Sequence, residues 1–431
     1  MKTEIKQYSN GITLAVTQMQ GFESVAFNIY VKTGSMNETE GYYGISHFIE
    51  HMLFKGTKKR STYQISKELD DIGANVNAFT DIEETTYFTK STNDNLETCV
   101  EILSDMFFNS VFDKKEMARE KKVVCEEISM YNDDAPSKCE LLSNTITYKG
   151  TNFALDVAGS KQSVRNLTKE KIDAYMKKFY TPENTIVSFT GNITLRQAEK
   201  LMEKYFLSHY GLSLKDEITP KKFIMPKQLK TVTKEQSIKE YKNNEQAHIC
   251  ISYKGFNRYN EQKYALFVLM NALGGNMSSK LFQRIREKLG LVYSISCTEN
   301  LNDAGGDVTI KFATTTKNAP LALTAIRQEI ESVIKNGLTE QEFLSAKKNL
   351  IASLKLSYEN TSSVNVSVCK NIHYYGEVLG KDARIEKTNN VTLNQVNLVA
   401  KQIFDTNNYF ISYVGKNTRI DLLKNYQSKI D

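Results

Sequence analysis

The chain has 431 residues with a formal net charge of +6, and 40% of its residues are hydrophobic and 25% charged. This length is too great for one ordinary domain, and it allows two halves of about 200 residues, each with its own core. Basic and acidic residues are interspersed, so we expect no nucleic-acid partner. We also expect a cytoplasmic chain with no membrane span and with free thiols, because no signal peptide or long apolar run is seen and the six cysteines are widely spaced.

The first predicted elements are a β-strand that begins at Val25 and a helix that contains the segment HFIEH. The apolar residues of this helix recur at helical spacing and predict a buried face, formed by Ile45, Phe48, Ile49, Met52 and Leu53.

The HFIEH segment carries the strongest chemical signal in the chain. His47 and His51 are four residues apart, so both imidazoles lie on one helix face and can bind one metal ion. Glu50 can reach a water on that ion without binding the ion itself. Two histidines at this spacing are often only structural, but the HxxEH order is an inverted zincin motif and favours a zinc site.

Two shorter segments follow. The sequence STYQISKELDDIG, from Ser61, predicts a helix that ends at Gly73. The run Asn77-Ala78-Phe79-Thr80 is compatible with a short edge strand, although its composition alone indicates no substrate contact.

A catalytic zinc site needs three protein ligands, and we predict the third on a helix over residues 113–131. Glu127 lies two helical turns after Glu120, on the same face, and is the preferred ligand, with Glu126 as an alternative. Glu120 is then expected to orient a histidine ligand through its other ring nitrogen. Acids on a lysine-rich helix more often form a solvated face, so this helix alone does not establish a site.

The chain contains an internal repeat, whose matching segments lie about 217 to 226 residues apart. Residues 166–191 and 390–415 both predict a helix, capped by Thr168 or Thr392, and then a strand that ends at glycine. Three other pairs of segments match in the same order; they begin at Val25 and Ala247, at Ser61 and Ser278, and at Phe112 and Leu338.

The second copy of the repeat lacks the metal-binding residues. The segment YALFVLM, from Tyr264, replaces HFIEH, and Ser353 and Ala346 stand opposite Glu127 and Glu120. The repeated fold therefore does not require these acids and histidines, which predicts one metal site per chain.

The repeat predicts an α+β fold with two homologous halves. We expect a catalytic zinc-binding domain over residues 1–212, a linker over 213–235 and a second domain without a metal site over 236–431. The linker carries Pro220 and Pro226 among Lys and Thr residues.

Several longer segments resemble the pitrilysin/insulinase family of zinc peptidases, and most closely its mitochondrial-processing-peptidase-like branch. These segments are HFIEHMLFKGT, GANVNAFTDIEETTYF, VVCEEISMYNDD and FQRIREKLGLVYSIS, and the match extends over nearly the whole chain. The family's glutamate ligand matches Glu127, 76 residues after His51, and its upstream acid matches Glu120. An Arg and a Tyr that the family brings toward the zinc from the later domain match Arg286 and Tyr293.

The resemblance also implies an architecture. Each half would be a mainly antiparallel sheet covered by helices, and the halves would form a clamshell with an internal chamber. A peptide substrate would add as a β-strand along Asn77, Ala78, Phe79 and Thr80. Two chains, identical or related, would pair as a homodimer or heterodimer.

These observations predict a zinc-dependent endopeptidase with one Zn²⁺ per chain and Glu50 as the general base. By resemblance, Tyr293 would stabilise the oxyanion and Arg286 would position the peptide. Two alternatives are a non-catalytic peptide-binding or scaffold subunit of a peptidase pair, and a metal hydrolase that acts on small molecules.

Overall fold

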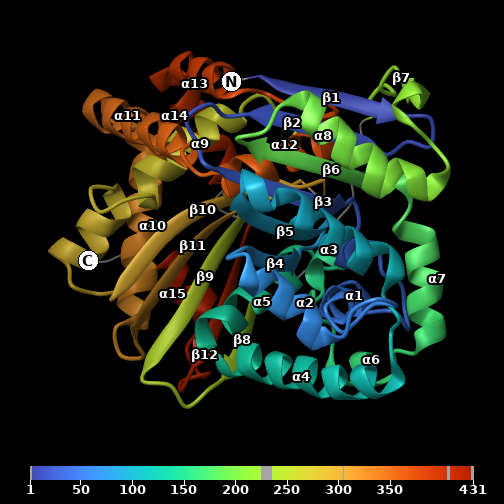
Figure 1. Cartoon of the computed structure of the whole chain (residues 1–431). Helices are drawn as coiled ribbons and strands as arrows, with labels where there is room; N and C mark the ends of the chain where they lie inside the picture. The colour runs from blue at the N-terminus through green and yellow to red at the C-terminus, as the bar shows by residue number, and fades with distance from the viewer. Residues whose placement is uncertain (1, 225–234, 304, 405–407, 429–431) are drawn as a thin grey trace. The chain divides into compact units, whose positions relative to one another are not determined.

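The computed structural model describes residues 2–224, 235–303, 305–404 and 408–428. They form two compact units, each built around one β-sheet (Figure 1). Unit 1 contains the described residues of 1–128, 156–225 and 355–381, and unit 2 contains those of 129–155, 226–354 and 382–431. Residues 225–234 of the expected linker, which include Pro226, lie outside the described residues.

Unit 1 is built on a sheet of seven described strands in the order β4-β5-β3-β6-β2-β1-β7 (Figure 1). Neighbouring strands are antiparallel except for β2 and β6, which are parallel. The strands are β1 (Thr3–Tyr8), β2 (Thr13–Gln18), β3 (Ser24–Val31), β4 (Asn75–Thr80), β5 (Thr85–Thr92), β6 (Thr185–Gly191) and β7 (Glu217–Ile218).

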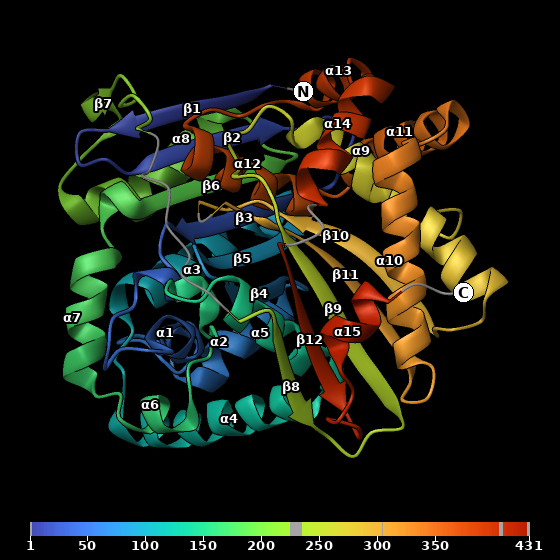
Figure 2. The ribbon, with the colours of Figure 1, turned by 180° about the vertical axis from the view of Figure 1, so that it is seen from behind.

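Helices cover both faces of this sheet. One face packs against α1 (Ile45–Leu53), α3 (Leu96–Asn109) and α8 (Leu195–Met202), and the other packs against α12 (Thr361–Tyr375) (Figure 2). Both faces of the sheet are apolar, because successive side chains of a strand point to opposite faces. In β3, Phe27 and Ile29 enter the larger core, whereas Tyr30 faces α12. The remaining helices of unit 1 are α2 (Thr62–Asp71), α6 (Lys161–Arg165), α7 (Lys169–Phe179) and the first part of α4 (Lys114–Asp133).

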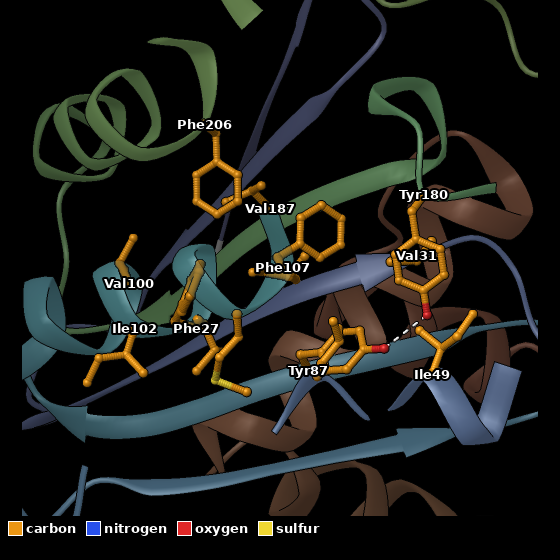
Figure 3. Close-up of a cluster of buried hydrophobic side chains, with 14 of the residues drawn as sticks. Phe27, Val31, Ile49, Tyr87, Val100, Ile102, Phe107, Tyr180, Val187 and Phe206 are labelled. Atoms are coloured by element: carbon orange, nitrogen blue, oxygen red, sulfur yellow. Dashed lines mark hydrogen bonds between the residues drawn. The ribbon is translucent and has the colours of Figure 1, made fainter. Parts of the chain in front are cut away.

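The larger core of unit 1 is rich in aromatic side chains. Phe27 stacks on Phe189 with ring centroids 4.9 Å apart. Tyr87 shares a 2.9 Å hydrogen bond with Tyr180 (Figure 3). Ile49, from the metal-motif helix, is fully buried in the same cluster (Figure 3). The helix that carries the histidines is thus fixed to the sheet by apolar burial.

Unit 2 is built on a sheet of five described strands in the order β10-β11-β9-β12-β8. They are β8 (Ser237–Tyr241), β9 (Gln246–Lys254), β10 (Ser294–Asn300), β11 (Asp307–Thr315) and β12 (Tyr409–Gly415), and β8 and β12 are the parallel pair. Helix α5 (Ala135–Thr147) packs on β9 and β12. The described part of unit 2 also contains four whole helices: α9 (Lys263–Gly274), α10 (Ala319–Asn336), α14 (Leu393–Ile403) and α15 (Leu422–Gln427). Two further helices belong to it for most of their length: α11 (Glu340–Ser357) and α13 (Lys381–Asn389).

The internal repeat is visible in both sheets. Strands β4, β5, β3, β6 and β2 correspond in order and direction to β10, β11, β9, β12 and β8. A matching side-chain contact accompanies them, since Lys121 Nζ donates to the carbonyls of Arg165 and Leu167, and Lys347 Nζ donates to those of Asn389 and Val391. The predicted α+β fold with two related halves is confirmed, and Thr168 and Thr392 cap their helices as predicted.

The compact units do not coincide with the two halves of the sequence. The segment 129–155, which includes α5, belongs to unit 2, and the segment 355–381, which includes α12, belongs to unit 1. All six cysteines are buried free thiols. No helix in the described ranges combines the length and hydropathy that a bilayer span needs.

Candidate metal centre

Helix α1 presents His47, Glu50 and His51 from a buried base. The five apolar residues predicted to form its inner face are all at most 1% exposed: Ile45, Phe48, Ile49, Met52 and Leu53. This burial fixes the rotation of the helix about its axis, so the two histidines four residues apart face the same direction.

His47, His51 and Glu127 come together at one point. His51 Nε2 lies 3.3 Å from His47 Nε2 and 3.3 Å from Glu127 Oε2, and His47 Nε2 lies 3.8 Å from the same carboxylate oxygen. In the described part of the chain, this is the one group of His, Cys, Asp or Glu side chains with a geometry that could hold a metal ion. Glu127, and not its neighbour Glu126, belongs to the group.

These distances fit a tetrahedral zinc ion. Zinc binds imidazole nitrogen and carboxylate oxygen at about 2.0–2.2 Å, and the tetrahedral angle then separates two ligand atoms by about 3.3–3.6 Å. The three measured separations are close to this range. Two nitrogens and one oxygen also leave a fourth position open, as a catalytic zinc site requires.

Glu120 orients His51 from the side opposite the cluster. Its Oε1 lies 2.9 Å from His51 Nδ1, and its Oε2 lies 2.9 Å from Lys55 Nζ. Burial opposes the charge of Glu120, but the hydrogen bonds from His51 and Lys55 outweigh it and lower the pKa of this carboxyl. An ionised Glu120 keeps the proton of His51 on Nδ1 and directs the Nε2 lone pair toward the cluster.

The two histidines have different electrostatic environments. Burial and the nearby His51 lower the pKa of His47 to about 4, so His47 is neutral at physiological pH. Burial also lowers the pKa of His51, but the hydrogen bond with Glu120 and the charges of Glu50 and Glu127 outweigh it and raise the pKa above its ordinary value. His51 therefore keeps its second proton to a higher pH than His47 does, and a metal ion competes with that proton more strongly at His51.

Glu50 lies beside the cluster and is held by the end of strand β4. Thr80 Oγ1 donates to Glu50 Oε2 at 2.7 Å, and the backbone of Thr80 also bonds this carboxylate. Burial raises the pKa of Glu50, the charge of Glu127 adds to the effect, and the bonds from Thr80 only partly offset it. A carboxylate with a raised pKa is a better proton acceptor near neutral pH.

Residues 77–80, whose sequence is compatible with an edge strand, lie in such a strand. Strand β4 ends the sheet of unit 1, and among the described strands it pairs only with β5. The backbone N–H of Ala78 donates to the Asn77 side-chain Oδ1 at 2.8 Å. Asn77, Ala78, Phe79 and Thr80 all belong to this strand.

Arg286 and Tyr293 belong to unit 2. Arg286 lies in a π-helical turn over Phe282–Lys288, with its guanidinium 4.5 Å from the centroid of the Phe282 ring. Tyr293 directly precedes β10; its backbone N–H donates to the carbonyl of Ala313, and 72% of the residue is exposed. Their roles toward a substrate remain predictions.

Two residues that the sequence did not single out also support the centre. Lys55 lies four residues after His51, a spacing that indicates a common helix face, although α1 ends at Leu53. Glu38 accepts hydrogen bonds from the backbone at the start of α1, and no local pattern in the sequence indicates this contact.

Comparisons with known proteins show the family to which the chain belongs. Residues 14–161 match the profile of the insulinase family (peptidase family M16), and residues 166–350 match that of the peptidase M16 inactive domain. The chain is 34% identical over 413 residues to the uncharacterized zinc protease YmxG of Bacillus subtilis, covering 95% of this chain and 98% of YmxG. It is 29% identical over 403 residues to an uncharacterized zinc protease of Rickettsia felis, covering 93% and 95% of the two chains.

The chain belongs to peptidase family M16, the insulinase family. Solved structures agree in fold. A protease from Helicobacter pylori superposes with a TM-score of 0.85 at 21% identity, covering 96% of this chain and 99% of the other. A peptidase M16 inactive domain from Pseudomonas fluorescens gives a TM-score of 0.85 at 17% identity, covering 97% and 99%.

Proposed function

We propose that the chain is a zinc-dependent endopeptidase that binds one Zn²⁺ through His47, His51 and Glu127. The observation that carries this proposal is the convergence of three ligand atoms, 3.3–3.8 Å apart, from two helices that are distant in the sequence. The names of the zinc-protease relatives support the same chemistry.

The chemistry of the proposed reaction is peptide hydrolysis. Bound zinc would supply Lewis acidity, polarising a peptide carbonyl and making a nearby water more acidic. Glu50 accepts a proton from that water at its carboxylate and then delivers it to the leaving amine. Thr80 holds the Glu50 carboxylate in place for both transfers, and Glu120 keeps the imidazole of His51 oriented.

We propose that the substrate binds in extended form along β4. An edge strand has backbone groups that no neighbouring strand uses, so an added peptide can bond to them without a strict sequence requirement. We infer that the Ala78 N–H points to this open edge, because its partner is a side chain and not β5. A peptide carbonyl would then replace the Asn77 side chain at this donor.

The family resemblance extends the proposal to features beyond unit 1. Arg286 would position the peptide and Tyr293 would donate to the developing oxyanion. An enclosed chamber, pairing with a second identical or related chain, a cytoplasmic location and membership of the mitochondrial-processing-peptidase-like branch belong to the same proposal.

The test is zinc content together with peptide cleavage. The purified chain should contain about one zinc per molecule by atomic spectroscopy, and it should cleave an internally quenched peptide. A chelator should abolish cleavage and added zinc should restore it. Cleavage that persists in metal-free protein would contradict the proposal, and stoichiometric zinc without any cleavage would favour the non-catalytic peptide-binding alternative.

A further inference from the structure

Glu38 caps helix α1 although it lies outside the helix. Its side chain is buried, at 3% exposure, and its two carboxylate oxygens accept from the backbone N–H groups of Gly44 and Ser46 at 2.7 and 2.9 Å. The first amides of a helix have no partner within the helix, and a carboxylate near them also interacts favourably with the helix dipole.

The helix cannot supply this cap from its own first residue. Its N-cap position is Gly44, which has a φ of 85° and makes no side-chain bond. A Cβ at this position would lie 2.4 Å from the carbonyl oxygen of Ala158. A capping Ser, Thr, Asp or Asn is therefore excluded by close packing, and Glu38 satisfies the amide of Ser46 in its place.

The loop before Glu38 also holds the end of strand β4. The N–H groups of Ser35 and Met36 donate to the carbonyls of Asp81 and Ile82 at 3.3 and 2.8 Å. Gly34 approaches this turn so closely that a Cβ would lie 2.2 Å from the Asp81 carbonyl oxygen. The turn directly follows Thr80, which bonds Glu50.

A buried hydroxyl network fixes the same helix end from another side. The hydroxyl of Tyr175 lies 2.9 Å from Ser46 Oγ and 3.2 Å from Thr33 Oγ1. Glu38 and Tyr175 thus both hold Ser46, the residue directly before His47. The second copy of the repeat differs here, because Tyr259 stands four residues after Gly255 where Glu38 stands four residues after Gly34.

We propose that Glu38 is a positioning residue that fixes helix α1 relative to strand β4, and thereby aligns the metal cluster with the edge that binds the peptide. This inference rests on the proposed zinc peptidase function. Its chemical basis is that a small displacement of α1 would move His47, Glu50 and His51 together, while Glu127 and Thr80 are held by other elements.

The test compares Glu38→Gln with Asp105→Asn. Glutamine keeps one acceptor but presents an NH₂ group to the second backbone donor. Asp105 is also a buried carboxylate of unit 1 with several donors, namely Thr57, Arg60 and Asn109, and these three donors lie outside α1. Zinc affinity is measured by competition with a chromophoric chelator, and kcat and KM are measured with a quenched peptide at saturating zinc.

We expect Glu38→Gln to bind zinc about 10-fold more weakly or worse and to lose at least about 10-fold in kcat, with KM nearly unchanged. Asp105→Asn should lower the thermal midpoint while keeping zinc affinity and kcat. Tyr175→Phe is a milder change at the same helix end, and it should lower zinc affinity and kcat by less than Glu38→Gln does. It replaces Glu38→Gln as the test variant if Glu38→Gln does not fold.

Wild-type zinc affinity and kcat in Glu38→Gln, or in Tyr175→Phe if the former does not fold, would overturn the inference. An equal loss in Asp105→Asn would also overturn it, because general destabilisation would then explain the effect. A wild-type chain that binds no zinc would instead overturn the proposed function itself.

Discussion

Thr80 donates its hydroxyl to Glu50 across 2.7 Å, and this bond joins the edge strand β4 to the helix that carries the histidines. The proposed general base is therefore positioned by the same strand that is proposed to bind the peptide. In the proposed mechanism, the position of the peptide and the transfer of the proton are therefore linked through the side chain of Thr80.

Glu50→Gln should keep zinc and lose activity. The amide cannot accept the proton of the attacking water, and loss of a general base costs about 10²–10⁴-fold in kcat. Zinc content and the cleavage rate of a quenched peptide measure the two effects separately. Equal activity in the variant would refute the role of Glu50.

Glu127→Gln should weaken zinc binding strongly, whereas Glu126→Gln should leave it unchanged. Glu127 lies within the cluster of ligand atoms, but its neighbour is exposed and points elsewhere on α4. The two variants have the same change in charge at adjacent positions, so net charge cannot explain a difference. Chelator competition gives both affinities, and similar values would remove Glu127 from the ligand set.

Lys55→Met should weaken zinc binding by up to about 10-fold, because Glu120 would lose the cation that holds its second oxygen and would orient His51 less firmly. The control is Lys67→Met, which removes an exposed lysine paired with Asp71 on the surface of α2. Equal zinc affinity in the Lys55 and Lys67 variants would show that Glu120 orients His51 without help from Lys55.

Ala78→Pro should raise KM for peptides and leave zinc content unchanged. Proline removes the backbone N–H that we infer to face the open edge of β4, and it should leave the hydrogen bonds to β5 intact. Ala78→Val keeps the N–H while adding bulk, so it separates a lost hydrogen bond from a steric effect. An unchanged KM in the proline variant would exclude this donor from substrate binding.

Zinc affinity should fall as pH falls, in two steps. The pKa of His51 is raised above 6.5, so below pH 6.5 zinc must displace one proton from His51, and each unit by which the pH falls should weaken affinity about tenfold. Near pH 4 His47 also takes up a proton and the slope should increase. Chelator competition between pH 4 and 8 tests this order, and a flat profile between pH 5 and 6 would contradict it.

Local features of the site followed from the sequence. The inner face of α1 was correctly predicted, because helical periodicity depends only on residues within one helix. The same reasoning placed His47 and His51 on one face, and Glu120 and Glu127 on another, and the structure brings these two faces together. The repeat was also readable, since matching segments keep their order along the chain.

Contacts between distant segments were decided only by the tertiary structure. The order of segments along the chain does not indicate that 129–155 belongs to unit 2 or that 355–381 belongs to unit 1. Where these segments pack depends on which face of each sheet the other helices leave uncovered. Nor does it indicate that Glu38 caps α1 or that Thr80 meets Glu50. The sequence determined which side chains share a helix face, whereas the packing of helices on the sheet determined which faces meet. The physical reason is that the hydrophobic effect is non-directional, so an apolar face can be buried against any other apolar face, near or distant in the sequence.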